Sequence, residues 1–270
     1  MIESSTGAAG LVVPAAQDAR RSFFTWMGGV LLVIVLVGFA PTLYFRSYFH
    51  PPEMPAYLYA HGSVLTTWFV LLLLQPLLIA NGQRTWHRRA GWLGALVAAA
   101  VVGISGFTDF HFVKRLAAQI GTAAPQLSHH DTAAQVSTAV LGFAGQILVF
   151  AALVTLAVLL RNSAASHKRL MLTASIGIVG AAAARWGYVL VAIGVAPQMA
   201  FPIAGIVGTL GVPWALLAAI VVHDKRTLGR VLPITWWTTG IAALLPLLVR
   251  QMGTAEIAIA WTSRMIYGAG

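Results

Sequence analysis

Histidines are the side chains of this sequence best suited to chemistry, and the chain carries eight of them among 270 residues. Neutral imidazole binds haem iron and divalent transition metals. The chain contains no cysteine, which excludes disulfides, thiolate ligands and thioether-linked haem. Histidine ligation of haem b or of a metal ion is therefore the first chemistry to consider.

His61 and Gln75 lie on one stripe of an apolar segment. Positions 61, 65, 68, 72 and 75 follow the spacing of one helix face, so Trp68 shares that face with them. A polar group at membrane depth is costly and often functional. His61 is thus a candidate ligand for haem or metal, with Gln75 as a hydrogen-bond partner. An interfacial histidine and an ordinary interhelix bond from Gln75 form the alternative, to which we give equal weight.

Aspartate and histidine also gather where the third apolar segment ends and the fourth begins. Carboxylate and imidazole together bind Zn, Fe or Cu. The candidate metal ligands are His61, Asp109, His111, His129, His130 and Asp131. However, Ser128 with Asp131 also matches the S-x-x-D capping box that precedes an apolar helix. Helix capping explains these two residues without a metal, and it is the interpretation that we favour.

Arg185 lies inside the fifth apolar segment and is the most costly residue at membrane depth. Such an arginine must pair with an acid, extend to the membrane surface or contact water. It is 18 residues from His167, so the two share one helix face about 27 Å apart. Arg185 is a candidate to hold an anion, a haem propionate or a quinone oxygen. A structural ion pair is the alternative.

Two similar basic clusters precede the third and fifth segments. One begins at His87 and the other at His167, and each histidine is followed by two basic residues. Either cluster alone is more typical of an anchor on lipid phosphates. Their repetition on nearby helices favours a shared site in which His87 and His167 bind a cofactor.

The composition establishes which elements must position these residues. Hydrophobic residues make up 59% of the chain and charged residues 9%, whereas a soluble domain carries about 25% charged residues. A soluble globule, a coiled coil and a disordered chain are therefore excluded. Seven segments approach the roughly 20 apolar residues of a membrane-spanning helix. They cover residues 24–45, 60–80, 91–108, 134–160, 170–196, 203–222 and 233–250. We expect an all-α, integral membrane helical bundle.

Basic residues give the bundle an orientation. Eleven of the 17 Lys and Arg residues lie on the side of the N-terminus, which predicts a cytoplasmic N-terminus and an outer C-terminus. The expected parts are a cytoplasmic tail over 1–23, the bundle over 24–250 and a short outer tail over 251–270.

The net charge of +10 fits basic loops facing anionic lipid and implies no nucleic-acid partner. No lysine lies in the seventh segment, which excludes a retinal pigment.

Small residues recur at helical spacing along two segments. Gly91, Ala95, Ala99 and Gly103 form one stripe, and Thr173, Gly177 and Ala181 form another. Small residues at this spacing let helices approach closely in lipid. Both stripes therefore predict helix–helix contacts within the bundle.

Several sequence blocks resemble a group of uncharacterised multi-pass bacterial membrane proteins. The blocks are H-x6-W, Q and H-R-R-x-G-W-x-G between Ala60 and Gly94, then H-K-R-L-M-L-T-A from His167, and Gly229-Arg230 with Pro233 and Trp236. The resemblance spans about residues 60–240 and implies fold and membrane location, with no reaction. A weaker likeness is to helical b-type cytochromes, although those place histidine pairs inside the spans, whereas His87 and His167 lie at the boundaries.

Three functions remain open from the sequence. The first is a redox-linked protein of the bacterial inner membrane that binds haem b or a divalent transition metal through histidines, with a quinone or another hydrophobic molecule as partner. The second is a carrier or binding protein for a small hydrophobic or anionic solute, with Arg185 and the His61 stripe lining its cavity. The third is a non-catalytic accessory subunit of a membrane complex. The sequence shows no nucleophile, carboxylate pair or phosphate loop, and whether the protein is an enzyme stays open.

Overall fold

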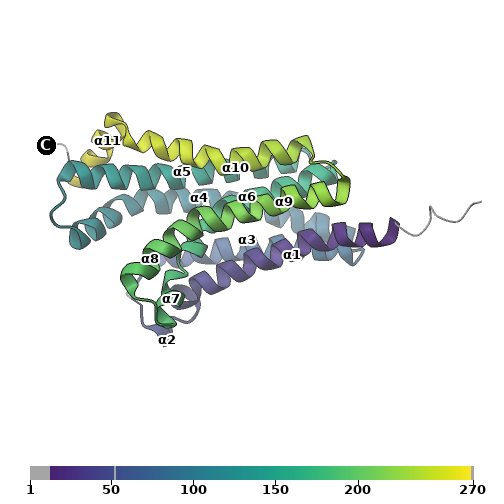
Figure 1. Ribbon diagram of the computed structural model, residues 1–270, viewed down its shortest axis with the longest axis horizontal. Helices are drawn as coiled ribbons and strands as arrows, with labels where there is room; N and C mark the ends of the chain where they lie inside the picture. The colour runs from purple at the N-terminus through teal and green to yellow at the C-terminus, as the bar shows by residue number, and fades with distance from the viewer. Residues whose placement is uncertain (1–12, 52, 269–270) are drawn as a thin grey trace, which may run out of the picture.

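The computed structural model describes residues 13–51 and 53–268, and every regular element within these residues is helical (Figure 1). The expected all-α bundle is therefore confirmed. The expected N-terminal tail, 1–23, falls partly outside the described residues. From residue 13 onward that segment already belongs to the first helix.

Up to Ala184, the chain consists mainly of long antiparallel helices. The elements are α1 (Val13–Phe39), the π-helical turn η1 (Ala40–Tyr44), α2 (Arg46–Phe49), α3 (Ala56–Ala80), α4 (Arg84–Ala123), α5 (His129–Leu159) and α6 (Ala164–Ala184). Asn81 is the residue at which α3 ends, and its backbone N–H bonds to carbonyls of the last helical turn.

After Ala184, the helices are shorter and are more often interrupted. Its elements are α7 (Gly187–Ala192), α8 (Pro197–Ile206), the π-helical turn η2 (Val207–Gly211), α9 (Val212–Leu228), α10 (Pro233–Gln251), the 3-10 turn η3 (Met252–Thr254) and α11 (Glu256–Tyr267). Pro233 is the first residue of α10, and Pro202 lies inside α8.

Six helical units are long and apolar enough to cross a membrane, and α10 with α11 makes a seventh if that pair, bent by 73°, counts as one span. Each of the seven predicted segments overlaps one of these units, although 24–45 and 134–160 extend one residue beyond it and 170–196 extends four. The stretch predicted as a short outer tail contains α11, which packs on α5 and buries Ile259 and Thr262.

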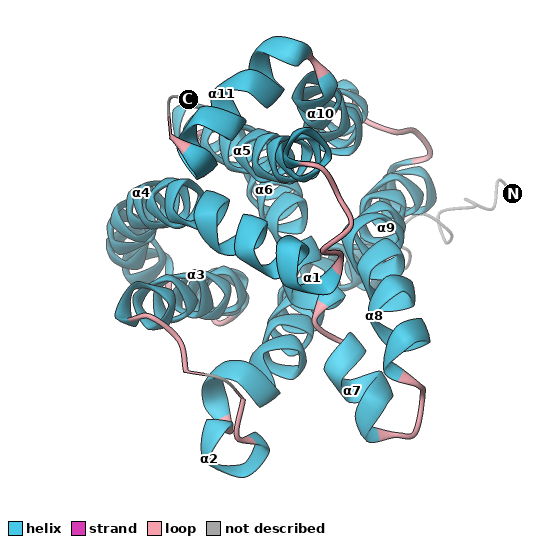
Figure 2. Ribbon diagram, turned by 90° about the vertical axis from the view of Figure 1, so that its left-hand side faces the viewer, coloured by secondary structure: helices cyan, strands magenta, loops and turns pink. Residues whose placement is uncertain are grey.

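The helices place the short loops 81–83, 160–163 and 229–232 at the end of the bundle where α1 begins (Figure 1). We call this the basic end, because most Lys and Arg residues lie there. The far end carries α2, α7, α8 and α11, and Figure 2 views the bundle from that side.

The core is centred on α6. Leu170, Ala174, Ile176 and Val179 are fully buried there, between α1, α5, α9 and α10. The outside of the bundle is apolar instead, since Trp92 and Leu96 of α4 are 76% and 68% exposed. Large apolar side chains on the outer surface fit a bundle embedded in lipid.

The small-residue stripe of α4 does not pack against another helix, so that prediction was wrong. Gly91 and Gly103 are exposed, and an added Cβ would meet no atom within 4 Å at either position. The closest helix contacts occur elsewhere. A Cβ at Gly38 would overlap the backbone of Ala182, and one at Gly208 would overlap the backbone of Ala184.

Candidate functional site

The structure brings His87 and His167 together at the basic end. Each lies in the first turn of its helix, α4 and α6 respectively, directly after a short hairpin loop. Their ring centroids are 6.5 Å apart, and the ring planes are nearly perpendicular, at 85°. Of the candidate sites predicted from the sequence, this pair is the one in which two histidines meet.

Main-chain carbonyls orient both rings. His167 Nδ1 lies 2.8 Å from the carbonyl oxygen of Ala157, and His87 Nδ1 lies 3.4 Å from that of Gln75. A carbonyl oxygen only accepts hydrogen bonds, so Nδ1 carries the proton in each ring. In the neutral tautomer this leaves the lone pair on Nε2, which is the arrangement of a metal-binding histidine.

The same contacts also have a structural role. Ala157 lies in the last turn of α5, where carbonyls lack partners within their own helix. The ring of His167 satisfies one of them and thereby joins α6 to α5. His87 joins α4 to α3 in the same way, through Gln75.

Gln75 belongs to this histidine pair and not to His61. The two residues share a helix face, but 14 residues of helix separate them by about 21 Å along the axis. The side-chain amide of Gln75 is buried, and neither its nitrogen nor its oxygen has a hydrogen-bond partner in the described part of the chain. A polar group in that state is costly unless a ligand or water satisfies it.

His61 lies near Arg185 toward the far end. Its ring reaches the main-chain carbonyl of Ile104 and is close enough to Arg185 for a Coulombic interaction. The His61 Nδ1 atom is buried and has no hydrogen-bond partner among the described residues. Trp68, on the same stripe, is buried in the core and donates to the hydroxyl of Ser175 at 3.0 Å, so this helix face points inward.

Arg185 ends α6 and forms no ion pair with any acid in residues 13–51 and 53–268. Its Nη1 atom donates to the carbonyl of Ala181 at 2.9 Å, and its guanidinium carbon lies 4.6 Å from the centre of the Phe39 ring. The structural ion pair considered as an alternative is thus not formed, and part of this cation's hydrogen-bonding capacity is unused.

The remaining metal candidates do not converge. His111 bonds to the carbonyl of Phe107 in its own helix at 2.9 Å and is exposed. Asp109 is partly buried, and its Oδ1 atom has no hydrogen-bond partner within the described residues. No group of three or more His, Asp or Glu side chains in the described ranges is placed to hold one metal ion.

The start of α5 makes helix-end contacts instead. The Ser128 hydroxyl accepts from the backbone N–H of Asp131 at 3.0 Å, as expected for a helix cap. The ring of His129 stacks on Tyr267, with centroids 4.1 Å apart, and His130 Nε2 lies 3.3 Å from Glu256 Oε2. Both histidines therefore join α5 to α11.

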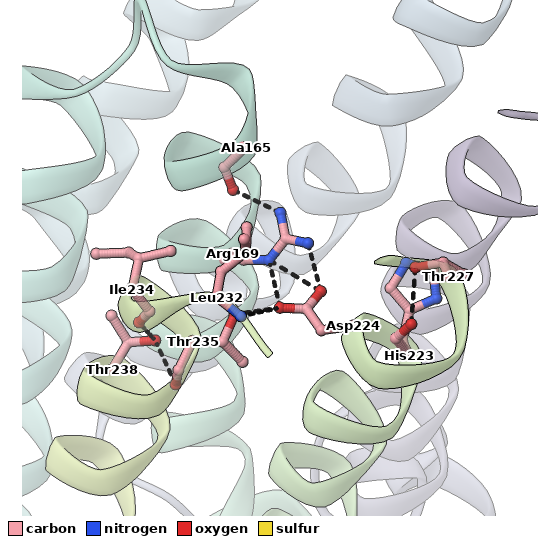
Figure 3. A network of polar contacts seen from close by, with 9 residues as sticks. All are labelled: Ala165, Arg169, His223, Asp224, Thr227, Leu232, Ile234, Thr235 and Thr238. Carbon is pink, nitrogen blue, oxygen red and sulfur yellow. Dashed lines mark hydrogen bonds and ion pairs between the residues drawn. The ribbon is translucent and has the colours of Figure 1, made fainter. Parts of the chain in front are cut away.

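A buried ion pair at the basic end was missed by the sequence analysis. Arg169 Nε donates to both carboxylate oxygens of Asp224, at 3.0 and 3.1 Å, and Arg169 Nη2 donates to the same carboxylate. The Thr235 hydroxyl and the backbone N–H of Leu232 also donate to Asp224 (Figure 3). Arg169 belongs to the basic cluster interpreted as a lipid anchor, and Asp224 follows the predicted segment 203–222 by two residues, so neither position indicated a buried partner.

Comparison with protein-family models, with curated proteins and with solved structures found no match to this chain. The resemblance to the bacterial membrane-protein group and to b-type cytochromes therefore stays an expectation, and function has to be argued from the geometry.

Proposed function

We propose that the chain is a redox-linked membrane protein that binds a divalent transition metal or haem b between His87 and His167. The observation that supports this most is the pair of rings 6.5 Å apart, each with Nδ1 on a main-chain carbonyl. A metal–imidazole bond of 2.0–2.1 Å puts the ring centre about 3 Å from the ion. Two rings on opposite sides of one ion thus have centres roughly 6 Å apart.

The surroundings fit such a group. Gln75, whose backbone carbonyl contacts His87, also carries a buried side-chain amide with unused hydrogen-bonding capacity. Arg88 follows His87 directly and would add positive charge for carboxylates such as haem propionates, whereas the Lys168 ammonium lies over the Phe24 ring, 4.4 Å from its centre. The bound group would supply one-electron chemistry, while this chain would hold it, orient its ligands and keep it at the end of an apolar bundle. The proposal places the protein in a bacterial inner membrane, as the basic loops and the resemblance imply.

Metal analysis and an optical spectrum of detergent-purified protein test the proposal. We expect either near-stoichiometric metal or reduced-minus-oxidised haem bands. His87→Asn and His167→Asn should each lower metal or haem affinity at least about tenfold. His111→Asn is the matched control, because His111 also contacts a main-chain carbonyl through Nδ1 but its ring neighbours are Phe107, Phe110 and Tyr57.

Asparagine separates ligand binding from helix joining. Its amide can still donate to the carbonyls of Ala157 and Gln75, so both variants should keep the thermal midpoint of the metal-free protein. Folded protein that stays colourless and takes up no Fe or Cu would refute the proposal, and uptake of Zn alone would refute its redox part, because Zn²⁺ is not redox-active.

A second candidate function rests on Arg185 and His61. The guanidinium of Arg185 keeps N–H donors that no described residue uses, and they lie beside His61 in the apolar bundle, which suits a small anionic solute. Thermal stabilisation of metal-free protein by a small carboxylic acid, abolished by Arg185→Gln and retained in Arg264→Gln, would support this function. No stabilisation by any such anion would count against it.

A further inference from the structure

A cleft separates α9 from α10 and is distinct from both groups described above. The two helices are joined at the basic end and diverge toward the far end (Figure 1). The π-helical turn η2 with Pro213, and Pro246 within α10, interrupt the regular helices beside it. The cleft encloses a cavity of about 150 Å³, floored by α5 and α6.

Two polar side chains that line this cavity have no partner among the described residues. Gln146 lies near the middle of α5, and neither its amide nor the guanidinium of Arg250 makes a hydrogen bond or ion pair with the described residues. The aliphatic part of Arg250 lies over Gly142, where an added Cβ would be 3.5 Å from it. Since Gly142 and Gln146 are one turn apart, the two polar groups approach the cleft at levels separated by about 6 Å.

The rest of the lining is apolar. Leu210, Leu217 and Leu247 contribute to the walls, and at Gly177 on the floor an added Cβ would meet no atom within 4 Å. Trp214 at the margin is 47% exposed on the apolar outside of the bundle. The cleft thus faces lipid along its length, with a cation at its far end.

We propose that this cleft binds a lipid-soluble molecule with an oxyanion head and an apolar chain. Arg250 presents a fork of N–H donors that matches carboxylate or phosphate oxygens. The amide of Gln146 donates to the same head one turn deeper. The apolar chain lies over Gly177 and between the leucines, where it fills space that the protein leaves open.

The occupant enters sideways from the membrane. An oxyanion at the far end stays close to the bilayer surface, where a charged head remains hydrated. Either a free fatty acid or the phosphate of a phospholipid supplies this chemistry. A quinone does not, because its carbonyl oxygens carry no charge for Arg250 to bind.

Binding of palmitate, phosphatidic acid and hexadecanol to purified full-length protein, measured by native mass spectrometry, tests the proposal. We expect palmitate or phosphatidic acid to bind, and the better of the two identifies the source of the head. Hexadecanol should bind at least about tenfold more weakly, because it lacks the charge. Equal binding of hexadecanol would overturn the proposal.

Variants locate the site. Arg250→Gln and Gln146→Leu should each weaken binding about tenfold or more, and Gly177→Leu should block it by filling the floor. Gly103→Leu and Arg264→Gln are the controls, because Gly103 faces open space on α4 and Arg264 is an exposed cation on α11. Undiminished binding in Arg250→Gln or Gly177→Leu would overturn the proposal. Binding of ubiquinone that is lost in Gln146→Leu but retained in Arg250→Gln would also overturn it. Metal or haem content should be unchanged in all of these variants, so this test is independent of the histidine pair.

Discussion

Arg169 and Asp224 are the residues whose individual loss should matter most for stability. The exposed fraction is 3% for Arg169 and 0% for Asp224, and the pair joins α6 to α9 while Thr235 and Leu232 add the start of α10. A buried charge is tolerated only when paired and hydrogen-bonded. Each charge of the pair therefore offsets the free-energy cost of removing the other from water.

Asp224→Ala should destabilise the protein by about 3–5 kcal/mol, because it leaves the Arg169 guanidinium buried without a counter-charge. The double variant Arg169→Met with Asp224→Leu should recover most of that loss, since it removes both charges. Thermal unfolding followed by tryptophan fluorescence in detergent measures both. A single variant as stable as the native chain would show that water reaches the pair.

At the scale of the elements, glycines set how closely α1 and η2 approach α6. Gly38 of α1 lies against the backbone of Ala182, and Gly208 of η2 against that of Ala184. A methyl group at either position would require the neighbouring helix to move. Close backbone contacts of this kind are the means by which helices pack in lipid.

Gly38→Ala should lower the stability by about 1–3 kcal/mol, because overpacking forces α1 away from α6. Gly29→Ala in the same helix is the matched control, since its added Cβ would meet no atom within 4 Å. Alanine there should be neutral or slightly stabilising, by up to about 1 kcal/mol. Equal thermal midpoints for the two variants would contradict the close contact.

At the scale of the whole molecule, the loops at the basic end should face the cytoplasm. The chain contains no cysteine, so single cysteines can be introduced without background. Asn162→Cys lies in the α5–α6 loop of the basic end, and Gln126→Cys lies in the α4–α5 loop of the far end; both positions are exposed. In intact bacterial spheroplasts an impermeant maleimide should label the far-end cysteine, and should label the basic-end cysteine only after permeabilisation. The reverse pattern would invert the proposed topology.

The sequence predicted the helices well because apolar length and helix-ending residues are local signals. The repeated basic clusters also indicated the His87–His167 pair. The sequence paired Gln75 with His61 because both lie on one face of α3. A shared face does not show which residue of a neighbouring helix lies opposite, and the carbonyl of Gln75 contacts His87 of α4. The Arg169–Asp224 pair and the α9–α10 cleft could not be derived, because one joins residues 55 apart and the other depends on a π-helical turn.

Both ends of α9 are held against neighbouring helices. Near Asp224 the helix is fixed by the ion pair to Arg169 and by the stacking of His223 on Phe23 of α1, with ring centroids 3.9 Å apart. At its other end, the preceding turn η2 is fixed by the close approach of Gly208 to the backbone of Ala184. The α9 wall should therefore act as a rigid template, so that the shape of the open space, and not its widening, selects the molecule that fits beside Trp214.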